Sequence, residues 1–224
     1  LQAKYPTISA SYEGQNREAS KLSASLASAG IPILILIYMT IAFTFRSFSQ
    51  PILLILLVPL SITGVAWGHW IHNFPLNILS ILGIIALIGI MVNDGLVLIG
   101  KFNNNLREGM TFDDALLNAG KSRFRAIFLT SVTTVAGLAP LLLEKSRQAQ
   151  FLKPMAISVS YGITFATLLT LIVLPVFLSY SNQIKVYIKW LTTGNFPSKE
   201  LVERPLLEKR DEEKMKEIEG SNTK

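Results

Sequence analysis

The sequence contains no cysteine among its 224 residues, and only 16% of them are charged. Without cysteine, a disulfide framework and a thiolate metal site are both excluded. The few charges are absent from several apolar runs of about 18 residues or more, whereas a soluble domain would interrupt such runs. Since half of the residues (50%) are hydrophobic, the composition indicates a membrane protein with several spanning helices.

Sequence motifs of enzymes and of nucleic-acid-binding modules are also absent. There is no glycine-rich phosphate loop with its lysine, no zinc-protease helix motif, and no arrangement of nucleophile, base and orienting group. The net charge of +6 resides mostly in loops and a tail rather than on a basic face with interleaved aromatic residues. We therefore expect no enzymatic activity, no cofactor and no nucleic-acid partner.

The apolar runs predict an all-α membrane protein, a bundle of five transmembrane helices. Short turns between successive runs force neighbouring spans to return antiparallel, as in helical bundles. A polar segment that opens with Thr111 as an N-cap before two aspartates predicts an amphipathic helix on the cytoplasmic membrane surface. The expected spans are residues 27–45, 51–71, 78–100, 126–143 and 154–180, and the surface helix covers residues 111–122.

Two segments flank the transmembrane domain, which we place at residues 16–182. Residues 1–15 alternate weakly between apolar and polar, so we expect them to be the end of a periplasmic domain. The chain begins with Leu1 and lacks the features of a signal peptide, which predicts a fragment of a longer polypeptide. Residues 183–224 predict a charged cytoplasmic tail, which we expect beyond Thr192 to be solvated and frayed apart from a short helix, with no chemistry of its own.

Lysine and arginine placement predicts the orientation of the spans. The loops on one side of the predicted bundle carry more basic residues than those on the other, and cytoplasmic loops are enriched in such residues. We therefore expect the N-terminus in the periplasm and the tail in the cytoplasm of a bacterial inner membrane. The basic residues of the cytoplasmic side are Arg46, Lys101, Arg107, Lys121, Arg123, Arg125, Lys185 and Lys189.

Asp94 lies in the middle of the third predicted span, within GIIALIGIMVNDGLVLIGKF. An aspartate at this depth costs about 2.5 to 3.5 kcal/mol, so such residues usually face a protein interior or an ion path. Small and polar residues around Asn93 form one stripe, which we expect to face a similar stripe around Thr130 on the fourth span. Asp94 and Thr130 could then be linked to load and release a proton. Alternatively, Asn93 and Asp94 only hold helices together.

Two histidines, His69 and His72, lie near one end of the second span beside two tryptophans. Histidines three residues apart could ligate a metal, but catalytic zinc sites normally require three protein ligands and no third is nearby. We therefore expect no metal site here. Aromatic rings at this position fit the headgroup zone of a membrane.

Several motifs occur together in one order and spacing. They are FRSFSQPILLILLVPLSITG, GIMVNDGLVLI, REGMTFDDALLNAGKSRFRAIFLTS, GLAPLL and TLIVLPVF. On these motifs, residues 12–182 resemble the C-terminal membrane half of inner-membrane permeases of the resistance-nodulation-division (RND) efflux family. The resemblance implies half of a twelve-helix, homotrimeric permease in which proton influx drives export of small molecules. It also implies an N-terminal half, a periplasmic adaptor and an outer-membrane channel as partners.

The resemblance also implies roles for individual residues. By position, Arg123 and Thr130 match the arginine and threonine of the family's proton relay. Asn93 falls where many drug exporters of the family have lysine, and Asp94 falls where they commonly have asparagine. This departure implies that Asp94 titrates itself or that the relay is rearranged. The predicted relay is therefore Asp94, Asn93, Thr130 and Arg123.

Two alternatives remain beside a drug exporter. Metal-exporting relatives also lack the lysine in places, so a heavy metal is an alternative substrate. A membrane scaffold or sensor that transports nothing could use the same bundle, with Asp94 as a packing residue.

Overall fold

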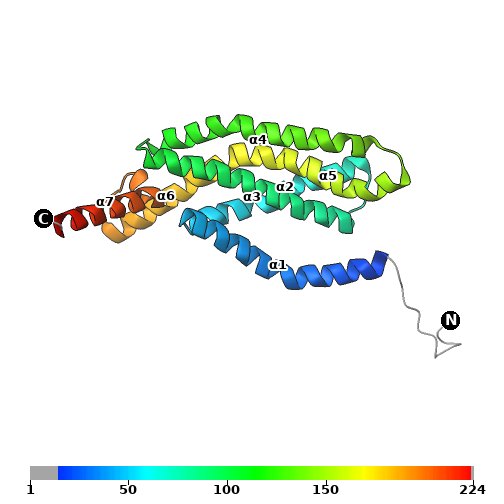
Figure 1. Cartoon of the computed structure of the whole chain (residues 1–224), viewed down its shortest axis with the longest axis horizontal. Coiled ribbons are helices and arrows are strands. Elements are labelled where there is room, and N and C mark those ends of the chain that lie inside the picture. Colours follow the sequence, from blue (N-terminus) through cyan, green and yellow to red (C-terminus); the bar gives the residue numbers. More distant parts are fainter. Residues whose placement is uncertain (1–14, 223–224) are drawn as a thin grey trace, which may run out of the picture. The chain divides into compact units, whose positions relative to one another are not determined.

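The computed structural model of the chain describes residues 15–222, which are helical almost throughout and contain no strand (Figure 1). The predicted all-α class is therefore confirmed. The chain divides into two compact units, Leu1–Thr40 and Ile41–Lys224. Residues 1–14, which hold nearly all of the expected periplasmic remnant, lie outside the described residues. The first expected span falls within α1 (Gln15–Phe45), whose described apolar part is Ile35–Phe45.

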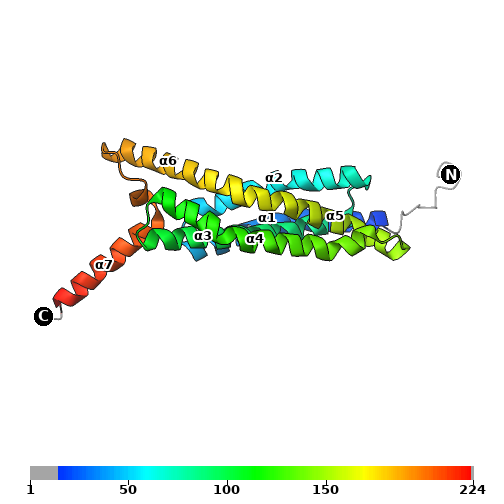
Figure 2. The same ribbon diagram turned by 90° about the horizontal axis from the view of Figure 1, so that it is seen from above.

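The four other expected spans are helices long and apolar enough to cross a membrane. They are α2 (Ser49–His72), α3 (Ile78–Arg107), α4 (Phe112–Leu143), and one continuous run from Arg147 to Thr193. This run consists of α5 (Arg147–Leu168), the π-helical turn η1 (Leu169–Val173) and α6 (Leu174–Thr193). Within the second unit α5 is central, because it packs against α2, α3 and α4 (Figures 1 and 2).

Polar side chains fix where three of these helices begin. Asn77 and Ser80 form a reciprocal capping box at the start of α3. The hydroxyl of Thr111 accepts a hydrogen bond from the backbone N–H of Asp114 at 3.2 Å, and Ser146 caps α5 in the same way. Each cap satisfies a backbone donor that the first turn leaves free.

Glycines allow α3 and α5 to approach closely. A Cβ placed on Gly83 of α3 would lie 2.7 Å from the backbone oxygen of Met155 and 2.7 Å from the Cβ of Ser158, both in α5. One turn further along, Leu87 of α3 fills the space that a Cβ on Gly162 of α5 would occupy. Small residues at such crossings are what lets membrane helices pack backbone to backbone. These two contacts also fix the register of α3 against α5.

The expected surface helix and the expected fourth span form one continuous helix, α4. The N-cap at Thr111 lies where the sequence predicts it, but no separate surface element follows. The physical reason is that nothing ends the helix: Gly120 is tolerated inside it, and no proline occurs before Pro140.

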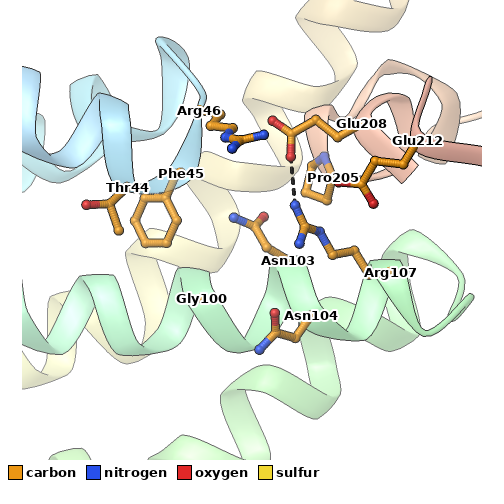
Figure 3. Close-up of a pocket in the computed structure, with 10 residues that line it drawn as sticks. All are labelled: Thr44, Phe45, Arg46, Gly100, Asn103, Asn104, Arg107, Pro205, Glu208 and Glu212. Carbon is orange, nitrogen blue, oxygen red and sulfur yellow. Dashed lines mark hydrogen bonds and ion pairs between the residues drawn. The ribbon is translucent and has the colours of Figure 1, made fainter. Parts of the chain in front are cut away.

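The tail holds a longer helix and more contacts with the bundle than the solvated, frayed segment with a short helix that its charge pattern predicts. A 3₁₀ turn, η2 (Glu200–Val202), and α7 (Arg204–Asn222) follow α6. The carboxylate of Glu203, 3% exposed, accepts hydrogen bonds from Lys185 Nζ at 3.0 and 3.1 Å. Glu208 forms an ion pair with Arg107 at 2.7 Å (Figure 3). Residues 199–209 are therefore docked on the ends of α3, α4 and α6, which we call the tail end of the bundle.

Candidate functional site

Asp94 lies on the stripe of α3 that faces the interior of the bundle. Leu87, Met91, Asp94 and Leu98 follow one another at spacings that keep side chains on one face of a helix, and all four are buried. The first of them contacts α5 at Gly162. Asp94 itself is 7% exposed. Its carboxyl group is therefore directed toward α5 rather than toward the exposed side of α3.

Asp94 has no polar partner within the part of the chain that the structure describes. No described residue donates a hydrogen bond to its carboxyl group or forms an ion pair with it. A carboxylate that is buried without such partners is costly. This combination of burial and isolation distinguishes Asp94 from the docked acids of the tail.

The three other residues of the predicted relay have different surroundings. Asn93 and Thr130 are exposed, and the Thr130 hydroxyl donates to its own helix, at Ile127 O (2.9 Å) and Ala126 O (3.2 Å). Arg123 is half-buried, and its Nε atom is buried without a hydrogen-bond partner. No hydrogen bond or ion pair between described residues connects these three to Asp94. The four-residue relay stays a prediction.

The structure does not bring the two small-residue stripes together. Gly89, beside Asn93 in the stripe of α3, has nothing within 4 Å of the position of an added Cβ. The contact between α3 and α4 lies nearer the tail end, where Asn105 Nδ2 donates to Ala115 O at 3.0 Å. Counting from there at ~1.5 Å per residue, Asp94 lies level with Ala126. Along the axis of α4, Asp94 therefore lies at a level between Arg123 and Thr130.

A polar group that the sequence did not single out lies in η1. Thr170 is 1% exposed, and its hydroxyl is buried without a hydrogen-bond partner. The wide turn is visible in the backbone, since the N–H of Leu174 donates to the carbonyl of Leu169, five residues earlier. Pro175 follows at once and has no N–H to continue an α-helical ladder. That proline was the available sequence signal for the turn.

The two histidines connect α2 to α5. His69 shares hydrogen bonds with the backbone oxygen of Phe74 and with Ser158 Oγ, both at 3.0 Å. His72 shares one with the Tyr161 hydroxyl, also at 3.0 Å. Among the described residues, no group of three or more His, Cys, Asp or Glu is placed to hold a metal ion.

A polar pocket of about 360 Å³ opens at the tail end (Figure 3). Its walls come from the turn after α1, the last turns of α3, and the start of α7. Arg46, Arg107, Glu208 and Glu212 place two positive and two negative groups around it. The pocket is therefore balanced in charge, and Arg107 is already paired with Glu208.

Comparison with known proteins shows relatives whose names refer to motility, metal resistance and multidrug resistance. The chain is 27% identical over 164 residues to the swarming motility protein SwrC of Bacillus subtilis, covering 73% of this chain and 16% of that protein. It is 30% identical over 147 residues to the cobalt-zinc-cadmium resistance protein CzcA of Cupriavidus metallidurans, covering 65% and 14%. It is 26% identical over 156 residues to the multidrug resistance protein MdtC of Erwinia tasmaniensis, covering 69% and 15%.

The fold is similar to that of a solved transporter. A crystal structure of a heavy metal efflux pump superimposes with a TM-score of 0.67 at 25% identity, covering 82% of this chain and 18% of the pump. The chain thus spans less than a fifth of the length of these relatives. The model of the AcrB/AcrD/AcrF family matches residues 3–181. The resemblance to RND permeases is thereby confirmed, and the chain belongs to the AcrB/AcrD/AcrF family.

Proposed function

We propose that this chain is the C-terminal translocation half of a proton-driven secondary transporter that exports small molecules across a bacterial inner membrane. The observation that carries the proposal is Asp94, a buried acid without a described partner in a helix long and apolar enough to span a membrane. Acids inside membrane helices usually mark ion or proton paths. Membership of a family of efflux transporters supports the same function.

The exposed side of α3 and α4 supports a second half as partner. Asn93 and Thr130 are polar, lie within membrane-spanning helices, and face away from the bundle of the second unit. Polar groups in such helices almost always face a bundle interior or an aqueous cavity rather than lipid. We infer that the N-terminal half of the permease covers this side, so that Asn93, Thr130 and Arg123 meet groups of that half.

The remaining assignments extend the proposal to the whole permease. The basic residues at the tail end support a cytoplasmic tail and a periplasmic N-terminus. A homotrimer, a periplasmic adaptor and an outer-membrane channel complete the assembly that we propose. Chemical cross-linking of the full-length protein in membranes tests the trimer, and labelling of a cysteine introduced at exposed Met215 from either side tests the orientation.

A heavy metal is the alternative substrate, and two observations favour it over a drug. By the resemblance, Asn93 falls where many drug exporters have lysine, and the names of CzcA and of the superimposed pump refer to metal resistance and to heavy metal efflux. Cells that lack their own exporters and express the full-length protein can be challenged in parallel with Zn²⁺ and with an amphipathic organic cation. Protection against only one of them assigns the substrate class.

The same cells test the proposed function itself. Asp94→Asn keeps the shape of the side chain but removes its titrating proton, so we expect resistance and efflux to be lost at unchanged expression. Asp113→Asn is the matched control, because Asp113 is an exposed acid in the first turn of α4, paired with Lys199. Efflux retained in Asp94→Asn would instead support the alternative of a packing residue in a scaffold or sensor.

A further inference from the structure

The face of α5 and η1 that meets the Asp94 stripe carries Gly162, Ala166 and Thr170. These residues are spaced four apart, so they lie along one side of the helix, and all three are buried. Gly162 is in contact with Leu87 of α3 and with Val65 of α2, and η1, which contains Thr170, contacts both α2 and α3. Thr170 is therefore on the side of its turn that faces α2 and α3.

Asp94 and Thr170 lie at the same depth in this interface. Helices α3 and α5 run in the same direction, because Gly83 meets Ser158 and, one turn later in both helices, Leu87 meets Gly162. Starting from the second contact at ~1.5 Å per residue, Asp94 is about 10 Å further along α3, and Thr170 about 12 Å further along α5. The difference is about one residue's rise, so the two side chains face the same level of the α3–α5 interface.

The hydroxyl of Thr170 has no hydrogen-bond partner among the described residues, whereas the hydroxyls of two threonines in α5 do. Thr164 donates to the carbonyl of Ser160 at 2.8 Å, and Thr167 donates to that of Ile163 at 2.8 Å. Threonines in helices commonly bond to the preceding turn in this manner. Thr170 does not, since it lies in the wide turn η1, and its hydroxyl is buried and unpartnered.

We propose that Thr170 is a positioning residue whose hydroxyl hydrogen-bonds the Asp94 carboxyl group, directly or through one water molecule. A buried hydroxyl and a buried carboxyl group each destabilise the protein when they lack hydrogen-bond partners, and this one pairing satisfies both groups. Its transport role rests on the proposed function, whereas the hydrogen bond itself does not. The bond directs Asp94 toward η1, so a change in the protonation of Asp94 acts directly on the wide turn between α5 and α6.

Infrared difference spectroscopy of the full-length protein in detergent tests this pairing. The carboxyl C=O band of protonated Asp94 is identified by its disappearance in Asp94→Asn. A hydrogen bond to this group lowers its stretching frequency, so Thr170→Val, which keeps the shape and removes the hydroxyl, should move the band to higher frequency. Thr170→Ser should restore the original frequency.

Thr164→Val is the matched control, because it removes a hydroxyl from the same helix that is already bonded to its own backbone. It should leave the band in place. A band that is unchanged in Thr170→Val overturns the pairing, and so does an equal displacement in Thr164→Val. Should Thr170→Val fail to fold, Thr170→Ala carries the same prediction.

The infrared spectra do not depend on transport, so the Thr170–Asp94 hydrogen bond and the proposed transport function can fail separately. If the band is displaced in Thr170→Val but Asp94→Asn still exports substrate, the hydrogen bond is supported and its role in transport is refuted. With both proposals right, Thr170→Val slows efflux and changes its dependence on pH, and Thr170→Ser recovers the wild-type profile.

Discussion

Gln50 and Asn103 join α2 to α3 through two hydrogen bonds between their side-chain amides. Gln50 Nε2 donates to Asn103 Oδ1 at 2.9 Å, and Asn103 Nδ2 donates to Gln50 Oε1 at 3.1 Å. Both residues are buried near the tail end, and Asn103 lines the polar pocket of Figure 3. Each amide satisfies the other, so the pair stabilises this end of the bundle only as long as both members are present.

The first prediction concerns this pair. Asn103→Leu leaves the buried amide of Gln50 without its partner, which should lower the free energy of unfolding in detergent by about 1 to 3 kcal/mol. The exposed neighbour Asn104 provides the control, since Asn104→Leu should change it by no more than about 0.5 kcal/mol. Equal effects of the two variants would contradict a stabilising role for the pair.

The second prediction concerns the close approach of α3 and α5. Gly83→Ala places a Cβ 2.7 Å from a backbone oxygen that cannot move aside, so it should destabilise the bundle by about 1 to 3 kcal/mol. Gly89→Ala on the same helix meets nothing within 4 Å and should be neutral or slightly stabilising. Thermal unfolding followed by circular dichroism compares the two variants. A Gly83→Ala protein as stable as Gly89→Ala would be inconsistent with the packing described.

The third prediction concerns the docked tail. Glu203→Ala leaves Lys185 and the amide of Asn182 without their carboxylate, and should weaken tail docking by about 2 kcal/mol. This is below the effect for a fully buried pair, because the Lys185 side chain is 25% exposed. Lys199→Ala, which removes an exposed pair with Asp113, should cost at most about 1 kcal/mol. Hydrogen exchange of the α7 backbone amides measures the effect of both variants on docking. Faster exchange in Lys199→Ala than in Glu203→Ala would refute the role of Glu203 as the main docking contact.

The fourth prediction concerns acid release of the tail. Glu200 accepts a hydrogen bond from the backbone N–H of Phe112 at 3.0 Å, and this bond holds the pKa of Glu200 below its ordinary value of 4.5. Because the pKa of Glu200 is lowered when the tail is docked, ionised Glu200 stabilises docking fully above its ordinary pKa. This stabilisation is lost as the pH falls through the lowered pKa. Spin labels at exposed Leu117 and Met215 should therefore begin to separate only below pH 4.5.

Glu200→Gln keeps an oxygen that can accept the Phe112 hydrogen bond but has no proton to gain. It should flatten this part of the pH dependence while the distance between the labels at neutral pH stays unchanged. The same acid transition in Glu200→Gln as in the wild type would assign the release to another group.

The sequence predicts the spans well because uncharged runs of about 20 residues have few alternatives to a membrane helix. Helix starts were also predictable where the signal is local, as at Thr111, whose hydroxyl binds the first turn of its own helix. The burial of Asp94 follows from its place in an apolar run. These features depend on residues that are neighbours along the chain.

Features that depend on distant residues were not predictable. The partners of the tail, such as Arg107 for Glu208 and Asp113 for Lys199, are close in space but far apart in sequence. Without knowledge of these partners, the charge pattern of the tail predicts a solvated segment. The small-residue spacing around Asn93 likewise indicates an interface but does not say which helix lies there, and no helix of the second unit covers that face.

Proton movement through Asp94 is the central claim, and proton uptake into proteoliposomes tests it most directly. The full-length protein is reconstituted with a pH-sensitive dye inside, and transport substrate is added under a proton gradient. We predict substrate-dependent uptake in the wild type and in Asp113→Asn, and only the leak of protein-free liposomes in Asp94→Asn. Substrate-dependent uptake at the wild-type rate in Asp94→Asn would contradict the account.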